Sequence, residues 1–539
     1  MAAVPPVHES PVTTTDPVDV IPPVEAQIAA AETDPRDHWF STDHLKGNLR
    51  QRTMKAGMVT MTSQGVKLLI RVGSTAIFAR LLTPKEFGVV ASVTVITGFV
   101  EMFKDAGLAT AMIQADRVTH RQASTLFWIN VAVAVVAGCI IAALAPAIVW
   151  FYKDERLLNI TFALAATVAV GGLSVQYIAI LRRRMEFGKL AVIELITMPT
   201  GIVIGVVMAW YGWSYWSLIG MTMAGPVVGA IVSYFMVPWR PGKPSKVQTV
   251  MGQVKLGLGL SGASVLGYTR ETFARLLIGR YFGISDLGVF SRAQELIQLP
   301  LRQALPPITS VLVPALSRLQ NDPVRYRAAF RRIFSLALLV TYPLMLMCIG
   351  CAREIVEVLL GGGEWMGAVP VLQGFGLLAI SIVPTSLGGT ALSTMGRSKE
   401  LLTWNFYSLI LTVICVLAAM PTGSIAWVAF AVGAGNLFLR TPGFFNMIAK
   451  ATPLQLRDLW TPMLAFGGAC IIGTIVAWLV ARGMLSQGFT SVPRLAASLT
   501  LGVLVYSVIA YLLPSGREAI DELKGMVLSK LRKKKPSDA

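Results

Sequence analysis

The chain has 539 residues, of which 54% are hydrophobic and 14% are charged, and its mean hydropathy is +0.63. Soluble domains carry about 25% charged residues, so this chain has too few charges to cover the surface of a soluble protein. The composition indicates a polytopic membrane protein. The net charge of +18 leaves nucleic acid as an alternative partner. The positions of the basic residues along the chain must decide whether this alternative holds.

Residues 1–53 are rich in Pro, Thr and acidic residues and lack a basic segment followed by an apolar core. We expect a disordered cytoplasmic tail here rather than a signal peptide.

From residue 54 onward, apolar runs follow one another with short polar breaks. A helix of about 20 apolar residues crosses the ~30 Å of hydrocarbon in a bilayer. We count fourteen such runs, near 57–79, 87–103, 123–151, 158–181, 190–210, 215–237, 256–279, 287–315, 333–351, 366–395, 401–420, 425–448, 460–481 and 493–513. The sequence therefore predicts an all-α membrane protein with about fourteen transmembrane helices.

Lys and Arg alternate between the two sides of this topology. The loops on one side, together with the tails, hold 31 of the 47 basic residues, and the loops on the other side hold eight. Because basic residues concentrate in cytoplasmic loops, we expect both termini in the cytoplasm. Topology and attraction to membrane lipids then explain the net charge, so nucleic acid is no longer a candidate partner.

Cysteine and histidine give no sign of a metal site. The five cysteines lie in apolar stretches, and three of the four histidines lie in the N-terminal tail. No set of these residues has metal-ligand spacing, so we expect no metal, no cofactor and no histidine-based catalysis.

An internal repeat appears at an offset of 200 residues, between ARLLTPKEFGVV and GRYFGISDLGVF. The matched residues are Arg80, Glu86, Gly88 and Val89 in the first segment and Arg280, Asp286, Gly288 and Val289 in the second. Each segment joins the first and second helices of a group of six. This predicts two pseudo-symmetric six-helix bundles, an arrangement typical of alternating-access transporters.

The repeat sets the predicted organisation of the chain. We expect an N-terminal bundle at 54–240, a C-terminal bundle at 241–450, two additional transmembrane helices at 451–514 and a basic cytoplasmic tail at 515–539.

Charged residues inside the apolar runs are the candidate site. Such residues usually face a cavity or a partner, because inserting each costs roughly 2.5 to 3.5 kcal/mol. The expected substrate-binding cations are Lys67, Arg71, Arg270, Arg275, Arg292 and Arg302. The expected counter-charges, which could also carry a coupling proton, are Glu101, Glu194, Glu271 and Glu295.

A structural role is the alternative for some of these charges. Glu271 with Arg275, and Arg292 with Glu295, have the spacing of ion pairs that only hold helices together. Lys67 and Arg71 have no carboxylate on their own helix, which favours a water-filled cationic cavity.

The repeated junctions are a candidate gate on the side opposite the termini. Arg80 and Arg280 end the first helix of each bundle, and Glu86 and Asp286 follow at the same step. We expect each Arg to pair with an acid across the bundles. The alternative is that these residues only cap helix ends at the level of the lipid headgroups, where Arg is common.

The stretch ARLLTPKEFGVVASVTVITGFVEMFKDAGLATAMIQ, followed by THRQASTLFWIN, resembles the bacterial polysaccharide export flippases. These form the Wzx-type branch of the multidrug/oligosaccharidyl-lipid/polysaccharide exporter superfamily. The resemblance rests on the R-L-L-T-P-x-E-F-G and D-x-G-L-x-x-A-x-I-Q elements, and it is sharp over about 57–152 and diffuse to about 450.

This resemblance implies a V-shaped pair of six-helix bundles around a cationic cavity in the bacterial inner membrane. It implies that the protein flips an undecaprenyl-pyrophosphate-linked oligosaccharide to the periplasmic leaflet for exopolysaccharide, capsule or lipopolysaccharide synthesis. The implied partners are that lipid-linked substrate, membrane lipids, and a polysaccharide polymerase with its export machinery.

Other functions stay open. A lipid-linked peptidoglycan precursor flippase would need similar charges, whereas an extruder of cationic drugs would need net-acidic cavity walls. A membrane polysaccharide polymerase or sugar transferase would need carboxylates or a basic catalytic loop at a membrane face, and the loops opposite the termini are too short and too poor in them. We therefore do not expect an enzyme.

Overall fold

The computed structural model describes residues 37, 39–40, 49–104, 109, 112–113, 115, 118–245, 251–514 and 516–518, and these contain helices but no strand. The first six long helices are α2 (Leu49–Leu81), α3 (Pro84–Lys104), α5 (His120–Tyr152), α6 (Arg156–Arg183), α7 (Phe187–Trp210) and α8 (Trp216–Met236).

The second half of the chain is helical in the same way. Its helices are α9 (Met251–Tyr281), α10 (Ile284–Arg318), α11 (Pro323–Gly350), α13 (Ala368–Thr394), α14 (Ser398–Ala419), α15 (Ile425–Ala434), α16 (Thr441–Ala451), α17 (Leu456–Ser486) and α18 (Ser491–Leu512). Short elements link them: α12 (Ala352–Ile355), the π-helix η4 (Val356–Leu360), η5 (Gly363–Gly367), η6 (Met420–Thr422) and the π-helix η7 (Gly435–Arg440). Because η7 joins α15 to α16 directly, these three elements form one rod.

The helices coincide to within a few residues with the fourteen predicted apolar runs, apart from ends that extend into polar sequence. α11, for example, begins at Pro323, ahead of the run that starts near 333, because its arginine-rich first turns continue the helix. Among the described residues, nine helices are long and apolar enough to cross a membrane. α2, α9 and α10 fall outside this set and carry most of the predicted intramembrane charges. An all-α, multi-pass membrane protein is confirmed, and the number fourteen stays a prediction.

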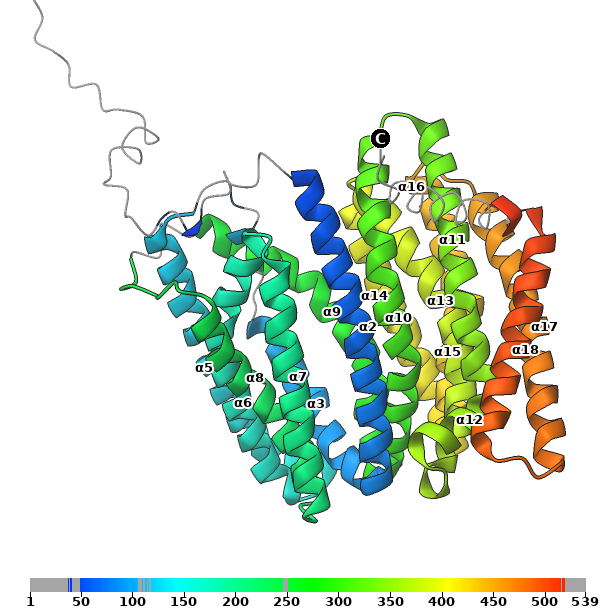
Figure 1. The fold of residues 1–539 in the computed structure, drawn as a ribbon, viewed down its shortest axis with the longest axis horizontal. Coiled ribbons are helices and arrows are strands. Elements are labelled where there is room, and N and C mark those ends of the chain that lie inside the picture. The colour runs from blue at the N-terminus through cyan, green and yellow to red at the C-terminus, as the bar shows by residue number, and fades with distance from the viewer. Residues whose placement is uncertain are drawn as a thin grey trace, which may run out of the picture.

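The long helices lie in two groups (Figure 1). In the first group α5 packs against α6, α7 against α8, and α6 against α8. In the second group α10 packs against α11 and α13, and α13 against α15. α17 and α18 pack together at the outer side of the second group, where α17 contacts α11. The exact bounds of the two predicted bundles stay a prediction.

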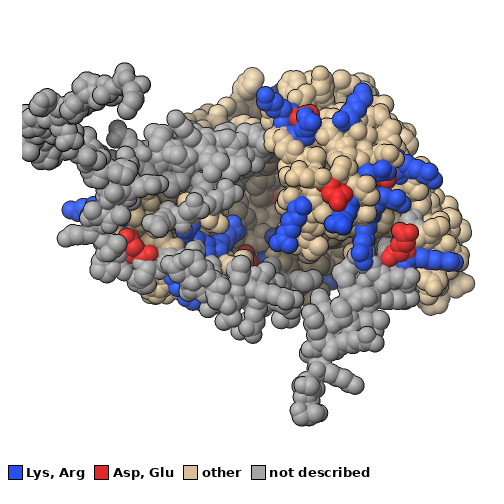
Figure 2. Space-filling view, turned by 90° about the horizontal axis from the view of Figure 1, so that it is seen from above, with Lys and Arg blue, Asp and Glu red and all other residues tan. Residues whose placement is uncertain are grey.

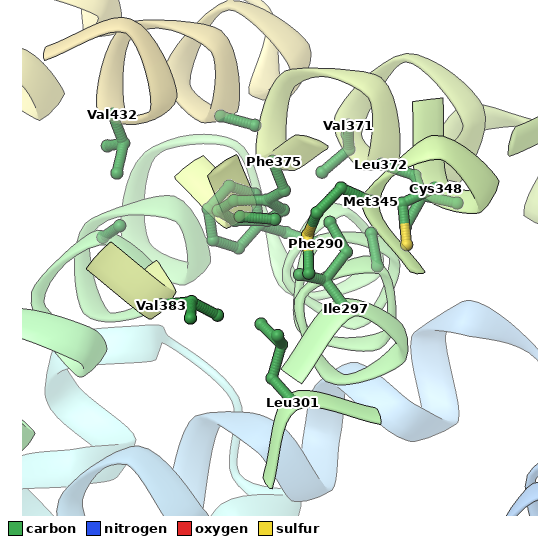
Figure 3. Packing of buried hydrophobic residues seen from close by; sticks show 14 of the residues in the cluster. Phe290, Ile297, Leu301, Met345, Cys348, Val371, Leu372, Phe375, Val383 and Val432 are labelled. Carbon is green, nitrogen blue, oxygen red and sulfur yellow. The ribbon is translucent and has the colours of Figure 1, made fainter. Parts of the chain in front are cut away.

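α10 shows how the sequence builds the second group. Its residues Phe290, Ile297 and Leu301 are buried and point into a core that α11, α13 and α15 complete (Figure 3). The rings of Phe290 and Phe375 meet edge to face with centroids 4.9 Å apart. Cys348 lies in the same core as a free thiol. Close packing of this kind holds helices together in lipid, where burial of apolar surface gives little driving force.

Parts of the predicted disordered tail are ordered. Residues 49–53 belong to α2. The Asp37 carboxylate accepts a hydrogen bond from the backbone nitrogen of His120 at 2.6 Å, and Phe40 is only 1% exposed against Trp239. The aromatic residues of this segment supply apolar area that the Pro-rich sequence before it lacks. The rest of the predicted tail lies outside the described residues, as does the C-terminal tail apart from 516–518.

The face at the top of Figure 1 bears the loop between α10 and α11 and the start of α2. Lys and Arg side chains gather on this face over the second group of helices (Figure 2). Arg327, in the first turns of α11, pairs its guanidinium with Asp458 at 2.9 Å. The opposite face bears the α2–α3 and α9–α10 junctions, and we call it the junction face. That the basic face is cytoplasmic stays a prediction.

Candidate functional site

A cavity of about 750 Å³ lies between α2, α7 and α8 of the first group and α10 of the second. A smaller cavity of about 310 Å³ lies beside it, against α3, α9 and α10. The two cavities adjoin, because Arg71, Arg292, Glu295 and Arg302 line both, and together they are called the site.

The structure brings seven of the predicted charged residues to this site. They are Lys67, Arg71, Arg275, Arg292, Arg302, Glu194 and Glu295. Five of them are cations and two are carboxylates, so the lining has an excess of positive charge.

The face of α10 opposite the core supplies three of these groups. Arg292 and Glu295 form an ion pair at 2.6 Å, and Arg302 donates a hydrogen bond to the Gln298 side-chain oxygen at 2.7 Å. Spacings of three, four and seven residues place these side chains on one stripe of the helix. One helix therefore packs an apolar face into the core and presents a charged face to the cavity.

Lys67 of α2 pairs with Glu194 of α7, with 2.5 Å between the ammonium nitrogen and the carboxylate oxygen. The Lys67 side chain is 15% exposed and that of Glu194 is 47% exposed. Glu194 is thus the carboxylate that balances one of the two α2 cations lining the site. The other, Arg71, lies one turn further along α2 and is exposed in the cavity.

Arg275 of α9 lines the smaller cavity and donates a hydrogen bond to the Thr272 hydroxyl at 3.3 Å. The ion pair with Glu271 that its spacing allows does not form within 4.0 Å in the described part of the chain. Three buried polar atoms of this cavity, Arg275 Nε, Ser291 Oγ and Gln294 Oε1, have no hydrogen-bond partner among the described residues. Such atoms suit a site that holds water or a polar ligand.

Three predicted residues are not among the described residues that line the site. Arg270 lies five positions before Arg275, which turns its side chain about 140° around the helix. It lies close enough to Arg440 of η7 for the two positive charges to repel each other. Glu271 is exposed one turn from Arg275, and the side chain of Glu101 lies outside the described residues.

Sequence reasoning missed Arg440 itself. Its guanidinium donates hydrogen bonds to Ser408 Oγ and Asn436 Oδ1, both at 2.9 Å. Ser408 and Asn436 are buried polar residues. The sequence offered one signal for it, since Arg440 is the single charged residue in the apolar run 425–448. Its place in a π-helix is notable because such segments often occur at functional sites.

The two repeated junctions meet each other at the junction face. A methyl carbon built on Gly88 would lie 1.8 Å from the carbonyl oxygen of Ile284, and one built on Gly288 would lie 1.9 Å from that of Pro84. No side chain larger than hydrogen fits such an approach. α3 and α10 therefore cross in backbone contact and close the site on this face.

The four predicted gate residues lie at this face, in contacts other than the expected ion pairs. Arg80 donates a hydrogen bond to the carbonyl oxygen of Val358 in η4 at 3.1 Å, which does link the two groups of helices. Glu86 accepts hydrogen bonds from the Thr83 backbone nitrogen at 2.7 Å and from the Ser214 hydroxyl.

The second junction likewise forms no ion pair across the groups among the described residues. The Arg280 guanidinium lies 5.9 Å from the ring centroid of Tyr281, and Asp286 stands in the first turn of α10. Glu86, the acid that Arg280 was expected to meet across the groups, is held instead by Thr83 in its own helix cap and by Ser214.

A buried ionic cluster supports η4 from the other side. Arg494 of α18 is 3% exposed and contacts Glu357 of η4 and, at 3.7 Å, Glu354 of α12. Burial raises the pKa of the Glu357 carboxyl, but hydrogen bonds from Arg353 and Ser491 outweigh it and hold that pKa below its ordinary value. The C-terminal helix pair thereby fixes the segment that Arg80 contacts.

A fold of two helical groups with a polar site between them defines a multi-pass membrane protein of the transporter type. The profile of the family described as "Polysaccharide biosynthesis protein" matches residues 77–370, which is more than half of the chain. The chain therefore belongs to the polysaccharide biosynthesis protein family, which confirms the resemblance seen in the sequence.

Individual relatives cover most of the chain. The succinoglycan biosynthesis transport protein ExoT of Rhizobium meliloti is 26% identical over 86% of this chain and 92% of its own length. The teichuronic acid biosynthesis protein TuaB of Bacillus subtilis is 23% identical over 85% of this chain and 95% of its own length. The lipopolysaccharide biosynthesis protein WzxC of Escherichia coli is 24% identical over 60% of this chain and 66% of its own.

Solved structures share the fold. An inward-closed conformation of the lipid II flippase MurJ superposes with a TM-score of 0.67 at 12% identity, covering 85% of this chain and 98% of its own. An inward-facing multidrug resistance MATE family transporter of the MOP superfamily has a TM-score of 0.58 at 13% identity, covering 71% of this chain and 94% of its own. These likenesses show the fold alone.

Proposed function

We propose that this protein flips an undecaprenyl-pyrophosphate-linked oligosaccharide across the bacterial inner membrane for surface polysaccharide synthesis. The family and the relatives support a role in polysaccharide transport. The transporter fold supports movement of a substrate between two groups of helices.

The excess of cations in the site is the observation that carries this proposal. A diphosphate cannot cross hydrocarbon unaided, because transfer of a charge out of water is prohibitive unless the charge is compensated. Arginine offers two parallel donors to phosphate oxygens. Arg71, Arg275 and Arg302 are the free or weakly engaged cations of the site, and the buried unpartnered atoms beside Arg275 add hydrogen-bonding capacity.

The geometry also supports a cycle of alternating access. The junction face is closed by backbone contact, so a substrate would enter the site from the membrane or from the basic face in this conformation. Delivery to the periplasm requires α3 and α10 to separate at the junctions. With both termini in the cytoplasm, a polysaccharide polymerase would receive the product on the far side.

A lipid-linked peptidoglycan precursor carries the same diphosphate, and the fold of the lipid II flippase is shared. Membership of the polysaccharide biosynthesis family favours the polysaccharide repeat unit over this second candidate. An extruder of cationic drugs is disfavoured by the sign of the charge in the site.

Complementation of a strain that lacks this protein tests the proposal. Arg71→Ala and Arg302→Ala should lower surface polysaccharide while the protein stays inserted and abundant. The lysine variants should restore part of the export, because they keep the charge and lose the fork of donors. Arg325→Ala is the matched control, since this arginine is 79% exposed outside the site. Normal export by the alanine variants would refute the assignment of the site.

A further inference from the structure

Phe87 stands between the charged site and the closed junction face. It lies in the first turns of α3, lines the smaller cavity and is 4% exposed. The guanidinium carbon of Arg292, on α10, lies 3.9 Å from the centroid of the Phe87 ring. α3 packs against α5 and α6 of the first group, and α10 belongs to the second, so this cation–π contact joins the two groups.

The same ring also belongs to the contact that closes the junction face. Phe87 meets Trp365 of η5 edge to face, with centroids 5.3 Å apart and an interplanar angle of 72°. The Trp365 indole nitrogen donates a hydrogen bond to the carbonyl oxygen of Ala79 in α2 at 3.0 Å. Gly88, which touches the backbone of α10, is the next residue after Phe87.

Arg292 has two partners in this conformation, the Glu295 carboxylate and the face of the Phe87 ring. An anion entering the cavity offers the guanidinium a charge-assisted, two-pronged interaction that is stronger than its attraction to a ring. The guanidinium already binds Glu295 while it lies over the ring, so an anion must draw it away to break the contact. An anion held farther along the cavity, beside Arg71 and Arg302, would draw the guanidinium off the Phe87 ring. Binding and closure thus compete for one side chain.

We propose that Arg292 and Phe87 form the coupling element by which a bound phosphate or pyrophosphate group releases the junction face. Withdrawal of the guanidinium removes the contact that holds Phe87 against Trp365, and α3 and α10 then separate. Arg292 acts on the anion, and Phe87 is a positioning residue that transmits the change. This inference rests on the proposed function, since it assumes an anionic headgroup in the site.

Spin labels across the junction face provide the test. Tyr211→Cys and Thr422→Cys, in full-length protein without its five native cysteines, place labels on exposed loops of the two groups. Distances are measured by pulsed electron paramagnetic resonance in proteoliposomes, without and with inorganic pyrophosphate. Pyrophosphate should shift the wild-type distribution toward long distances.

Variants separate the cation–π contact from simple packing. Phe87→Leu and Arg292→Met should each raise the resting open-to-closed ratio by about 2- to 30-fold, the range expected from the strength of such contacts. Both should also lose most of the response to pyrophosphate. Phe87→Tyr, which keeps an aromatic face, should behave like wild type. If Arg292→Met stays closed at rest, or Phe87→Leu responds in full, the coupling element is refuted.

Calorimetric titration with pyrophosphate distinguishes this inference from the proposed function. If pyrophosphate binds in a manner that depends on Arg71 and Arg302 but moves no label, the coupling element fails and the binding site stands. If pyrophosphate does not bind to the wild-type protein, both fail together.

Discussion

Gly88 and Gly288 occupy equivalent places in the two repeats, and each lies against the backbone of the other's helix. Gly88 faces the carbonyl oxygen of Ile284, and Gly288 faces the carbonyl oxygen of Pro84. Pro84 is the counterpart of Ile284, because it lies 200 positions before Ile284. This reciprocity is what a pseudo-two-fold axis through the crossing of α3 and α10 requires. The repeat in the sequence thus corresponds to two equivalent contacts between α3 and α10.

The first prediction concerns this crossing. Gly88→Ala should prevent closure of the junction face, because its methyl group would lie 1.8 Å from the Ile284 oxygen. Overpacking of this kind costs about 1 to 3 kcal/mol, enough to shift a two-state equilibrium roughly 5- to 150-fold. Export should fall, and a Cys introduced by Val90→Cys should react faster with a membrane-impermeant maleimide added at the junction face.

Gly468→Ala in α17 is the control, since a methyl group there meets nothing within 4 Å. It should leave both export and labelling unchanged. Unaltered labelling of the Gly88→Ala variant would mean that the crossing is not the closed gate.

The sequence predicted the fold far better than the contacts of the site. Apolar runs locate helices because crossing the membrane demands length and apolarity, both local properties. Five of the six predicted cations reach the cavities for the same reason, since a charge in a span must face something polar. Arg270 does not, because which side of α9 faces the cavity depends on how α9 packs, and hydropathy does not contain that information.

Contacts between segments that are distant in the chain could not be predicted from the sequence. Arg80 meets Val358 and not Asp286, because residues of α18 place η4 beside α2. Arg280 does not pair with Glu86, because Glu86 is held by Thr83 and Ser214. The glycines of the repeat were visible, but their role depends on a crossing of backbones that no local pattern reveals.

The Lys67–Glu194 pair gives the second prediction. Glu194→Gln frees Lys67 and adds one positive charge to the site, so the affinity for pyrophosphate should rise by about 1.5- to 5-fold, as for loss of a partly exposed ion pair. Export should fall, because release of the headgroup becomes slower. Titration calorimetry and export assays measure the two effects.

Glu400→Gln, which removes the partner of Arg397 away from the two cavities, should change neither quantity. A lower affinity of the Glu194→Gln variant, together with a lower melting temperature, would show instead that the pair only holds α2 against α7.

The third prediction concerns Arg494. Arg494→Met should destabilise the protein by about 3 to 5 kcal/mol, because it leaves buried carboxylates without a partner. Thermal unfolding in detergent measures the change. Adding Glu354→Gln and Glu357→Gln should recover part of the lost stability. A single variant as stable as wild type would show that Arg494 does not hold η4 in place.

The same cluster predicts a dependence on pH. The folded-state pKa of Glu357 lies below its ordinary value, so its contribution to stability is complete above the ordinary value and is lost as the pH falls through the lower folded-state value. The melting temperature should therefore fall at acidic pH, and less so in Glu357→Gln. Equal acid sensitivity in the variant would place the effect elsewhere.

The fourth prediction is the topology. Reporter fusions after Trp239 and Lys399 should report cytoplasm, and fusions after Tyr211 and Gly362 should report periplasm, because the basic loops stay on the cytoplasmic side. One reversed signal would break the predicted alternation of spans.

Transfer of substrate in proteoliposomes tests the central claim most directly. A labelled undecaprenyl-pyrophosphate-linked oligosaccharide is placed in one leaflet, and its arrival in the other is followed by access to a membrane-impermeant reagent. The account predicts transfer by the wild-type protein and a loss of about tenfold or more in Arg71→Ala and Arg302→Ala, as for removal of a charge-assisted contact worth about 1.5 to 3 kcal/mol. Wild-type protein that moves no substrate, or alanine variants that move it at the wild-type rate, would contradict it.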